Sequence, residues 1–64
     1  MTFSQKLKRA RILKDYTQAQ VAELIGVARS TYNDYESGRR QPNIDRLTKI
    51  IHVLDIDAND LFKN

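Results

Sequence analysis

The stretch Thr17–Gly38, TQAQVAELIGVARSTYNDYESG, predicts two short helices joined by a tight turn. Its opening threonine is followed three residues later by Gln20, which matches a capping box and marks a helix start. Gly26 stands where that helix needs a left-handed residue to end, and the closing glycine does the same for the second helix. We therefore predict that the second helix covers about residues 29–36 and that a helix-turn-helix covers about residues 18–36.

The side chains of this stretch suit two helices that cross steeply. Ala22 is small where the two helices must touch, and Val27 is an apolar residue that can plug the corner after the turn. Tyr32 and Tyr35 are three residues apart, so they share one face of the second helix, which we expect to be buried. This combination favours a helix-turn-helix.

Helix signals recur outside this stretch, whereas no segment alternates apolar and polar residues long enough to predict a strand. Thr2 and Gln5 match another capping box, and the helix that they open should end near Asp15. Asn43 caps a fourth helix, and Asp57 starts a last short turn. The apolar residues that we expect on these helices' inner faces or on the last turn are Phe3, Leu7, Ala10, Val21, Leu24, Ile25, Ile44, Leu47, Ile50, Ile51, Leu54, Leu61 and Phe62. We predict an all-α fold, a compact five-helix bundle that forms a single domain over residues 1–64.

The composition excludes several classes of protein. The 64 residues contain no cysteine, so disulfides, thiolate zinc sites and cysteine nucleophiles are not available. No apolar run approaches the roughly 20 residues that a membrane helix needs, and no signal peptide opens the chain. His52 is the only histidine and has no convincing catalytic partner nearby in the sequence. We expect no enzyme, no metal, no cofactor, no membrane contact, and no room for a domain that senses a small-molecule ligand.

The charge is concentrated in the first part of the chain. Residues 1–40 carry eight Lys or Arg against four acidic residues, whereas residues 41–64 carry three against four. The first part is therefore +4 and the second part −1, within a total of +3. A basic excess on one part of a small domain indicates a polyanionic partner such as nucleic acid, although a solvated basic surface explains the charge equally well.

The face of the second helix opposite the tyrosines is polar. It carries Arg29, Ser30, Asn33, Asp34 and Ser37. A major groove admits one α-helix, and short donors and acceptors on that helix can distinguish base edges. Arginine bonds guanine, asparagine bonds adenine, aspartate accepts from cytosine, and serine can do either. We predict that the first four of these residues read bases; the alternative is an ordinary solvated face.

The longer stretch YTQAQVAELIGVARSTYNDYESGRRQPNIDRLTKIIHVLDIDANDLF resembles the Cro/CI-type helix-turn-helix family, often called the XRE family. The resemblance extends from about Leu7 to Phe62, and its most specific motifs are TQ, IGV, YESGRRQP and DANDLF. It implies a five-helix, lambda-repressor-like DNA-binding domain of the kind found in bacterial and phage transcriptional regulators. Three features depart from the family pattern: aspartate replaces glycine at Asp15 and Asp55, Ala28 replaces a serine or threonine cap, and Tyr32 is unusually bulky.

The resemblance also implies roles for individual residues. Arg29, Ser30 and Asp34 match positions that contact bases in phage repressors, and Gln18 matches a position that contacts the DNA backbone. The residues that we predict to contact phosphates are Gln18, Ser37, Arg39, Arg40, Lys6 and Arg9. In the family, an arginine and a glutamate at the positions of Arg11 and Glu36 pair, so we expect a scaffold ion pair there.

These observations predict a sequence-specific regulator of transcription that binds double-stranded operator DNA. We expect a cytoplasmic, nucleoid-associated protein of a bacterium or phage-infected cell that acts as a repressor. We also expect a homodimer on a palindromic operator, joined through the C-terminal part, where Val53, Ile56, Leu61 and Phe62 are candidates. The alternative is a protein-interaction module, such as an antitoxin or a regulatory subunit, which an exposed Ile12 would favour.

Overall fold

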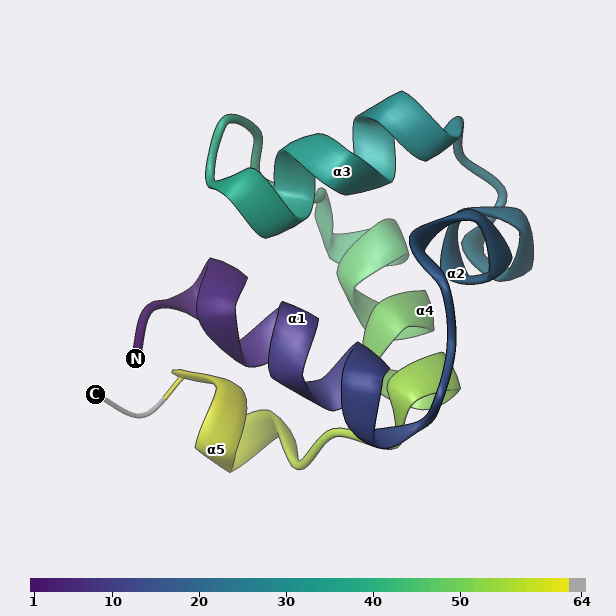
Figure 1. Ribbon diagram of the computed structural model, residues 1–64. Coiled ribbons are helices and arrows are strands. Elements are labelled where there is room, and N and C mark those ends of the chain that lie inside the picture. The colour runs from purple at the N-terminus through teal and green to yellow at the C-terminus, as the bar shows by residue number, and fades with distance from the viewer. Residues whose placement is uncertain (63–64) are drawn as a thin grey trace.

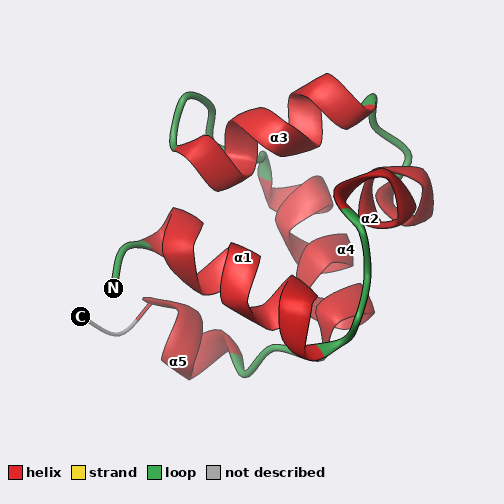
Figure 2. Cartoon of the chain, viewed as in Figure 1, coloured by secondary structure: helices red, strands yellow, loops and turns green. Residues whose placement is uncertain are grey.

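The computed structural model describes residues 1–62, which form the five expected helices and no strand (Figures 1 and 2). The helices are α1 (Phe3–Leu13), α2 (Gln18–Ile25), α3 (Arg29–Ser37), α4 (Ile44–Leu54) and α5 (Ala58–Phe62). The prediction of an all-α, five-helix fold is confirmed. Lys63 and Asn64, which end the predicted domain range of 1–64, lie outside the described residues.

Local capping chemistry sets the helix starts. Both predicted capping boxes are present: the hydroxyls of Thr2 and Thr17 each accept from the backbone N–H three residues later, and the side-chain oxygens of Gln5 and Gln20 accept from the backbone N–H groups of these threonines in return. Asn43 Oδ1 accepts from the backbone N–H at the third position of α4, 2.9 Å away. These bonds satisfy N–H groups that a helix start otherwise leaves without a partner.

Left-handed residues cap the C-terminal ends of α2, α3 and α4, and a fourth follows the cap of α1. Gly26 and Gly38 cap α2 and α3 with φ of 76° and 83°. Asp15 and Asp55, where the family often has glycine, also adopt positive φ, 64° and 52°. Aspartate tolerates this conformation better than most residues with a Cβ, so both connections keep the sharp bend without glycine.

The core is made by all of the first four helices, and α5 adds to it. Its buried residues are Leu7, Val21, Ala22, Ile25, Tyr32, Tyr35, Ile50, Leu54 and Leu61. Two expected core residues are exposed instead: Leu24 keeps 53% of its surface and Ile44 keeps 76%. Leu24 lies about 60° around α2 from Val21 and about 100° from Ile25, at the margin of the strip that α3 and α4 cover. Ile44 belongs to the first turn of α4, which contains no buried residue.

Helix α1 lies between α3 and α5 and contacts both (Figure 1). Helix α2 packs against α3 and against α4. This arrangement puts α3 on one side of the molecule, across α1 from α5, with the helix's outward face free of other helices (Figure 2).

Candidate nucleic-acid interface

Helix α3 has one buried and one exposed face, as its sequence predicts. Tyr32 is fully buried and Tyr35 is 3% exposed, and their rings meet edge to face with centroids 6.2 Å apart. Such an arrangement is favoured for aromatic pairs and fixes the rotation of α3 about its axis. The opposite face presents Arg29, Ser30, Asn33 and Ser37 as exposed residues, with Asp34 half-buried.

A polar cluster ties α3 to the two helices behind it. Arg11 of α1 donates from Nε to Glu36 Oε2 at 2.7 Å and from Nη2 to Oε1 at 3.2 Å. A third donor, Nη1, bonds the backbone oxygen of Tyr16 at 2.8 Å. Gln18 of α2 donates from Nε2 to Glu36 Oε1 at 3.1 Å. The structure therefore brings Arg11, Gln18 and Glu36 together, and the forked geometry is the strong form of this contact.

Titration of this cluster follows from its burial and its hydrogen bonds. Burial alone acts to raise the pKa of Glu36, but hydrogen bonds from Arg11 and the other neighbouring donors outweigh it, so the pKa is lowered. The hydrogen bond to Glu36 raises the pKa of Arg11. Burial, and then the nearby carboxylate of Glu36, raise the pKa of the Tyr32 hydroxyl. That hydroxyl lies beside the pair, but it reaches no described residue with hydrogen-bond geometry.

Gln18 occupies the first turn of α2, where we predicted a phosphate contact. Its side-chain amide is directed to Glu36. The first N–H groups of α2 have no partner within the helix, and only that of Gln20 is capped by Thr17. At this helix start, mainly backbone N–H groups are therefore available to bind a phosphate. The side-chain amide of Gln18 instead holds α2 against α3.

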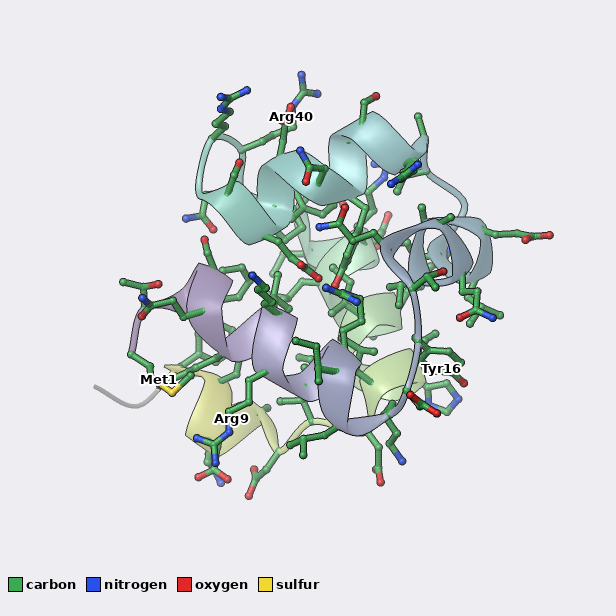
Figure 3. The ribbon with its side chains drawn as sticks, viewed as in Figure 1. Met1, Arg9, Tyr16 and Arg40 are labelled. Carbon is green, nitrogen blue, oxygen red and sulfur yellow. The ribbon has the colours of Figure 1, made fainter. Side chains whose placement is uncertain are left out.

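Further residues that we predicted to contact DNA lie at the end of α3. The backbone oxygen of Asp34 accepts from Ser37 Oγ at 3.1 Å and from the N–H groups of Arg39 and Arg40 at 3.0 and 3.3 Å. Arg40 Nε also lies 3.8 Å from Asp34 Oδ2, a loose pair with 62% and 27% of the side chains exposed. Both arginines are exposed, and Figure 3 shows Arg40 on the side of α3. Ser37, Arg39 and Arg40 thus adjoin the polar face of α3.

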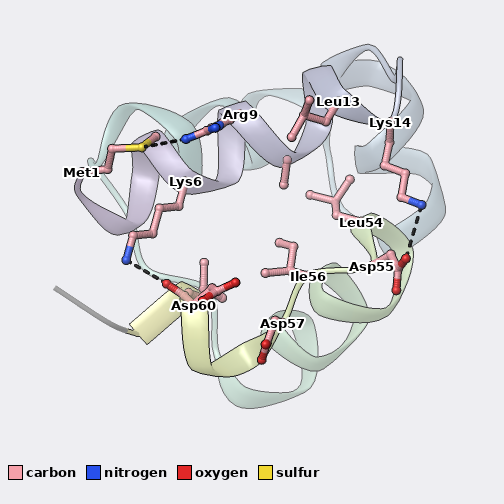
Figure 4. Close-up of a pocket in the computed structure, with 12 residues that line it drawn as sticks. Met1, Lys6, Arg9, Leu13, Lys14, Leu54, Asp55, Ile56, Asp57 and Asp60 are labelled. Atoms are coloured by element: carbon pink, nitrogen blue, oxygen red, sulfur yellow. Dashed lines mark hydrogen bonds and ion pairs between the residues drawn. The ribbon is translucent and has the colours of Figure 1, made fainter.

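Lys6 and Arg9 lie elsewhere. Both line a groove of about 540 Å³ between α1 and the segment from Leu54 to Leu61 (Figure 4). Lys6 Nζ donates to the backbone oxygen of Asp60 at 2.8 Å, and Arg9 Nη1 lies 3.6 Å from Met1 Sδ. Figure 3 shows Arg9 on the α5 side of α1, away from α3. The structure therefore does not bring these two residues together with the other predicted phosphate contacts.

Sequence reasoning gave no role to two residues beside the turn of the helix-turn-helix. Thr31 and Arg46 line a second cavity, of about 510 Å³, together with Tyr35 and Arg40. Thr31 lies one turn before Tyr35 on α3, so helical spacing indicates that they share a side. Nothing in the sequence shows that α4 brings Arg46 to the same place.

Residues 1–62 contain no candidate metal site and no helix that could span a membrane. No group of three His, Cys, Asp or Glu side chains in that range could hold a metal ion. His52 is exposed on α4. None of the five described helices is long and apolar enough to cross a bilayer.

Comparison with known proteins gives matches over nearly the whole chain. A helix-turn-helix family model (HTH_3) matches residues 7–61. Similar proteins include YonR of Bacillus subtilis, a prophage-derived HTH-type transcriptional regulator, 34% identical over 95% of this chain and 56% of YonR. YqaE of the same organism, an HTH-type transcriptional regulator, is 38% identical over 95% and 53%. RstR of Vibrio cholerae, a cryptic phage CTXphi transcriptional repressor, is 36% identical over 95% and 54%.

The chain therefore spans about half the length of these relatives. Among solved structures, a chain of the SinR protein/SinI protein complex matches with a TM-score of 0.86 and 31% identity. That match covers 98% of this chain and 62% of the other.

Proposed function

Because the chain belongs to the Cro/CI-type (XRE-like) helix-turn-helix family, we propose that it is a transcriptional regulator that binds double-stranded DNA in a sequence-specific way. The observation that carries this proposal is the outward face of α3, an exposed set of short polar side chains on a helix that no other helix covers. The buried tyrosines and the Arg11–Glu36 pair hold this face in one orientation. A fixed polar helix face is what direct reading of base edges requires.

We assign base reading to the polar residues on the outward face of α3, near its start and middle. Arg29 has two donors for guanine, and Asn33 can bond adenine with its amide. Ser30 lies beside them, and Asp34 can accept from cytosine. The carboxylate of Asp34 repels phosphates, so its presence on this face lowers affinity for DNA in general and favours selection of particular bases.

Phosphate contacts would hold α3 in register. The candidates that adjoin α3 are Arg39, Arg40 and Ser37, together with the free N–H groups at the start of α2 near Gln18. These contacts carry no sequence information, but they make binding strongly dependent on salt. Lys6 and Arg9 have the right charge, but their position beside α5 gives this role less support.

We further propose that the protein acts as a repressor and as a homodimer on a palindromic operator in the cytoplasm. One α3 covers only a few base pairs, which gives too little selectivity in a genome. A two-fold dimer doubles the site and sets two copies of α3 about 34 Å apart in successive major grooves. Of the apolar candidates in the C-terminal part, Val53 and Ile56 are half-buried and Phe62 is 61% exposed, whereas Leu61 is in the core.

The test is selection of bound sites from a random duplex pool, followed by binding measurements on the selected duplex. Arg29→Ala should cost about 1–3 kcal/mol of binding free energy and relax preference at one base pair. Arg40→Ala should weaken binding to all sequences alike. Lys49→Ala, which removes an exposed charge from α4, is the matched control. Unchanged affinity and preference in Arg29→Ala, or one chain bound per non-palindromic site, would contradict the assignment of α3 or the dimer respectively.

A second candidate function is a protein-interaction module with the same fold. One solved structure similar to this chain is a complex between two proteins, SinR and SinI. Here Leu13 and Phe62 are 76% and 61% exposed, and such residues can form a docking surface. Absence of salt-dependent binding to any duplex would favour this candidate over the first.

A further inference from the structure

The outward face of α1 carries apolar side chains that no other described helix covers. Ile12 is 56% exposed and Leu13 is 76% exposed, although α1 contacts both α3 and α5 through its other sides. At about 100° per residue, Gln5, Arg9 and Ile12 fall within about 60° of one another, opposite the buried side of α1. Single exposed apolar residues need no explanation, whereas adjoining ones point to an interaction surface.

Two hollows adjoin this face and meet along α1. The shallower one, of about 290 Å³, is lined by α1 alone, through Gln5, Lys8, Arg9, Ile12 and Leu13. The groove of about 540 Å³ between α1 and the segment from Leu54 to Leu61 shares Arg9 and Leu13 with it (Figure 4). Helix α1 is about 16 Å long, so the two hollows together suit an elongated partner that lies along it.

The charge on this face is positive and uncompensated. Helix α1 contains four cations and no acidic residue. Lys8 forms no hydrogen bond or ion pair with any residue between 1 and 62, and Arg9 has only the sulfur of Met1, 3.6 Å from Nη1. The other two cations of α1 bond oxygen atoms within the fold. Lys8 and Arg9 are both exposed, so their charges are available to an anionic partner.

These charges distinguish three kinds of occupant. A two-fold contact of this face with a second copy would bring Lys8 and Arg9 of each chain near those of the other, which opposes association. An anionic bilayer would gain little apolar contact, because only Ile12, Leu13 and Met1 are exposed apolar residues on this side of the domain. A helix with acidic residues beside an apolar stripe matches both the apolar pair and the cations.

We propose that the outward face of α1 is a docking site for an acidic amphipathic helix of another protein. The apolar stripe of that helix lies over Ile12 and Leu13, and its acidic residues contact Lys8 and Arg9. The site rests on neither proposed function, because it belongs to a helix other than α3 and its test contains no DNA.

The neighbouring groove sets the orientation of the partner. On the near wall, Lys6 and Lys14 already bond residues across the groove (Figure 4). The far wall carries the carboxylates of Asp55, Asp57 and Asp60. These carboxylates repel acidic residues, so the partner's acids lie on the opposite flank, beside Lys8. Leu13 is about 140° around α1 from Lys8 and borders the groove, so the partner's apolar residues lie there.

The probe is a synthetic peptide of about 16 residues, long enough to form an isolated helix. It carries leucine at positions i, i+3, i+4 and i+7, glutamate beside this stripe and alanine elsewhere. One control peptide has lysine in place of every glutamate, and the other has alanine in place of every leucine. Binding of each labelled peptide to the protein is measured by fluorescence anisotropy at several salt concentrations.

A double variant with a matched control tests the apolar contact. Ile12→Ser combined with Leu13→Ser removes the apolar pair from α1. Leu24→Ser combined with Ile44→Ser removes two apolar side chains of similar exposure, 53% and 76%, from α2 and α4. Thermal unfolding of each double variant checks that it is folded.

The charge is tested in the same way. Lys8→Gln removes an exposed charge from the site, and Lys49→Gln removes an exposed charge from α4. The wild type should bind the acidic peptide saturably and bind neither control peptide. The Ile12/Leu13 double variant should bind at least about tenfold more weakly. Lys8→Gln should bind about two- to fivefold more weakly, with a loss that shrinks as salt rises, and both control variants should bind like the wild type.

Several outcomes would overturn the site. These are no saturable binding of the acidic peptide below about 1 mM, equal binding of the lysine peptide, or equal losses in the control variants. A wild type that ignores the peptide but binds phosphatidylglycerol vesicles through Ile12 and Leu13 would assign the face to a membrane instead. Sedimentation that shows self-association abolished by the Ile12/Leu13 double variant, without peptide binding, would assign it to a second copy. None of these outcomes bears on DNA binding by α3, which is measured separately.

Discussion

Replacing Glu36 by alanine should destabilise the fold more than any change on the outward face of α3. The carboxylate of Glu36 accepts two bonds from Arg11 and one from Gln18, so it connects α1, α2 and α3. The side chain of Glu36 is 3% exposed and that of Arg11 is 13% exposed. After the substitution, Arg11 keeps only the backbone oxygen of Tyr16 as an acceptor, and the amide of Gln18 loses its acceptor.

The expected loss follows from the burial of the pair. Removing one partner of a buried ion pair costs about 3–5 kcal/mol because the other charge stays buried without compensation. Arg11 retains one bond and some contact with water, so the lower end, about 3 kcal/mol, applies here. A chain of 64 residues has a total stability of only about 3–10 kcal/mol. In a domain of this size, about 3 kcal/mol corresponds to a fall in thermal midpoint of about 12–24 °C.

The measurement is thermal unfolding at pH 7, followed by circular dichroism. Glu23→Ala is the matched control, because Glu23 is an exposed glutamate on α2 and its side chain makes no described contact; its cost should stay within about 0.5 kcal/mol. Adding Arg11→Ala to Glu36→Ala should cost less than the sum of the single changes, since both remove the same pair. A midpoint for Glu36→Ala within about 4 °C of the Glu23→Ala midpoint would refute the reasoning.

The same pair predicts how stability depends on pH. The pKa of Glu36 is lower in the folded protein than its ordinary value of 4.5. The stabilisation is therefore fully present above the ordinary pKa and is lost as the pH falls through the folded value. The difference in stability between the wild type and Glu36→Gln should be constant from about pH 6 to 8 and should shrink below about pH 4. A difference that stayed constant down to pH 2 would mean that the charge of Glu36 contributes nothing.

Two further predictions concern the ends of α2 and α3. Gly26→Ala should lower the free energy of unfolding by about 1 kcal/mol through backbone strain alone, because φ is 76° and no atom lies within 4 Å of the added Cβ. A denaturant titration that gave a loss above about 3 kcal/mol would indicate a steric clash instead. Ala28→Ser should stabilise the fold by about 0.5–1 kcal/mol, because it supplies the side-chain cap that α3 lacks. An unchanged thermal midpoint would show that a hydroxyl at this position does not reach the N–H groups of α3.

The helix boundaries could be predicted because they depend on local chemistry. A capping box involves residues three apart, such as Thr17 and Gln20, and a left-handed stop involves one residue, such as Gly26. Burial depends instead on which helices cover a side chain. Leu24 is apolar and lies near the inward strip of α2, but neither α3 nor α4 covers it. No pattern within α2 alone distinguishes Leu24 from Ile25.

The positions of the predicted phosphate contacts also depend on packing between helices, which the sequence pattern does not show. Charge marks Lys6 and Arg40 as candidates equally well, because both are basic residues in the first part of the chain. The fold separates them: Lys6 bonds the backbone of α5, whereas Arg40 follows α3. Arg46 lies in the part of the chain with net negative charge, and only packing brings it to the second cavity, beside the start of α3.

Helix α3 alternates residues that hold it in place with residues that face outward, so stability and recognition can be separated by experiment. Tyr32 and Glu36 point inward one turn apart, while Arg29 and Asn33 point outward one turn apart. Inward changes should lower the thermal midpoint and weaken DNA binding only by reducing the folded fraction, without altering base preference. Outward changes should alter base preference at an unchanged midpoint.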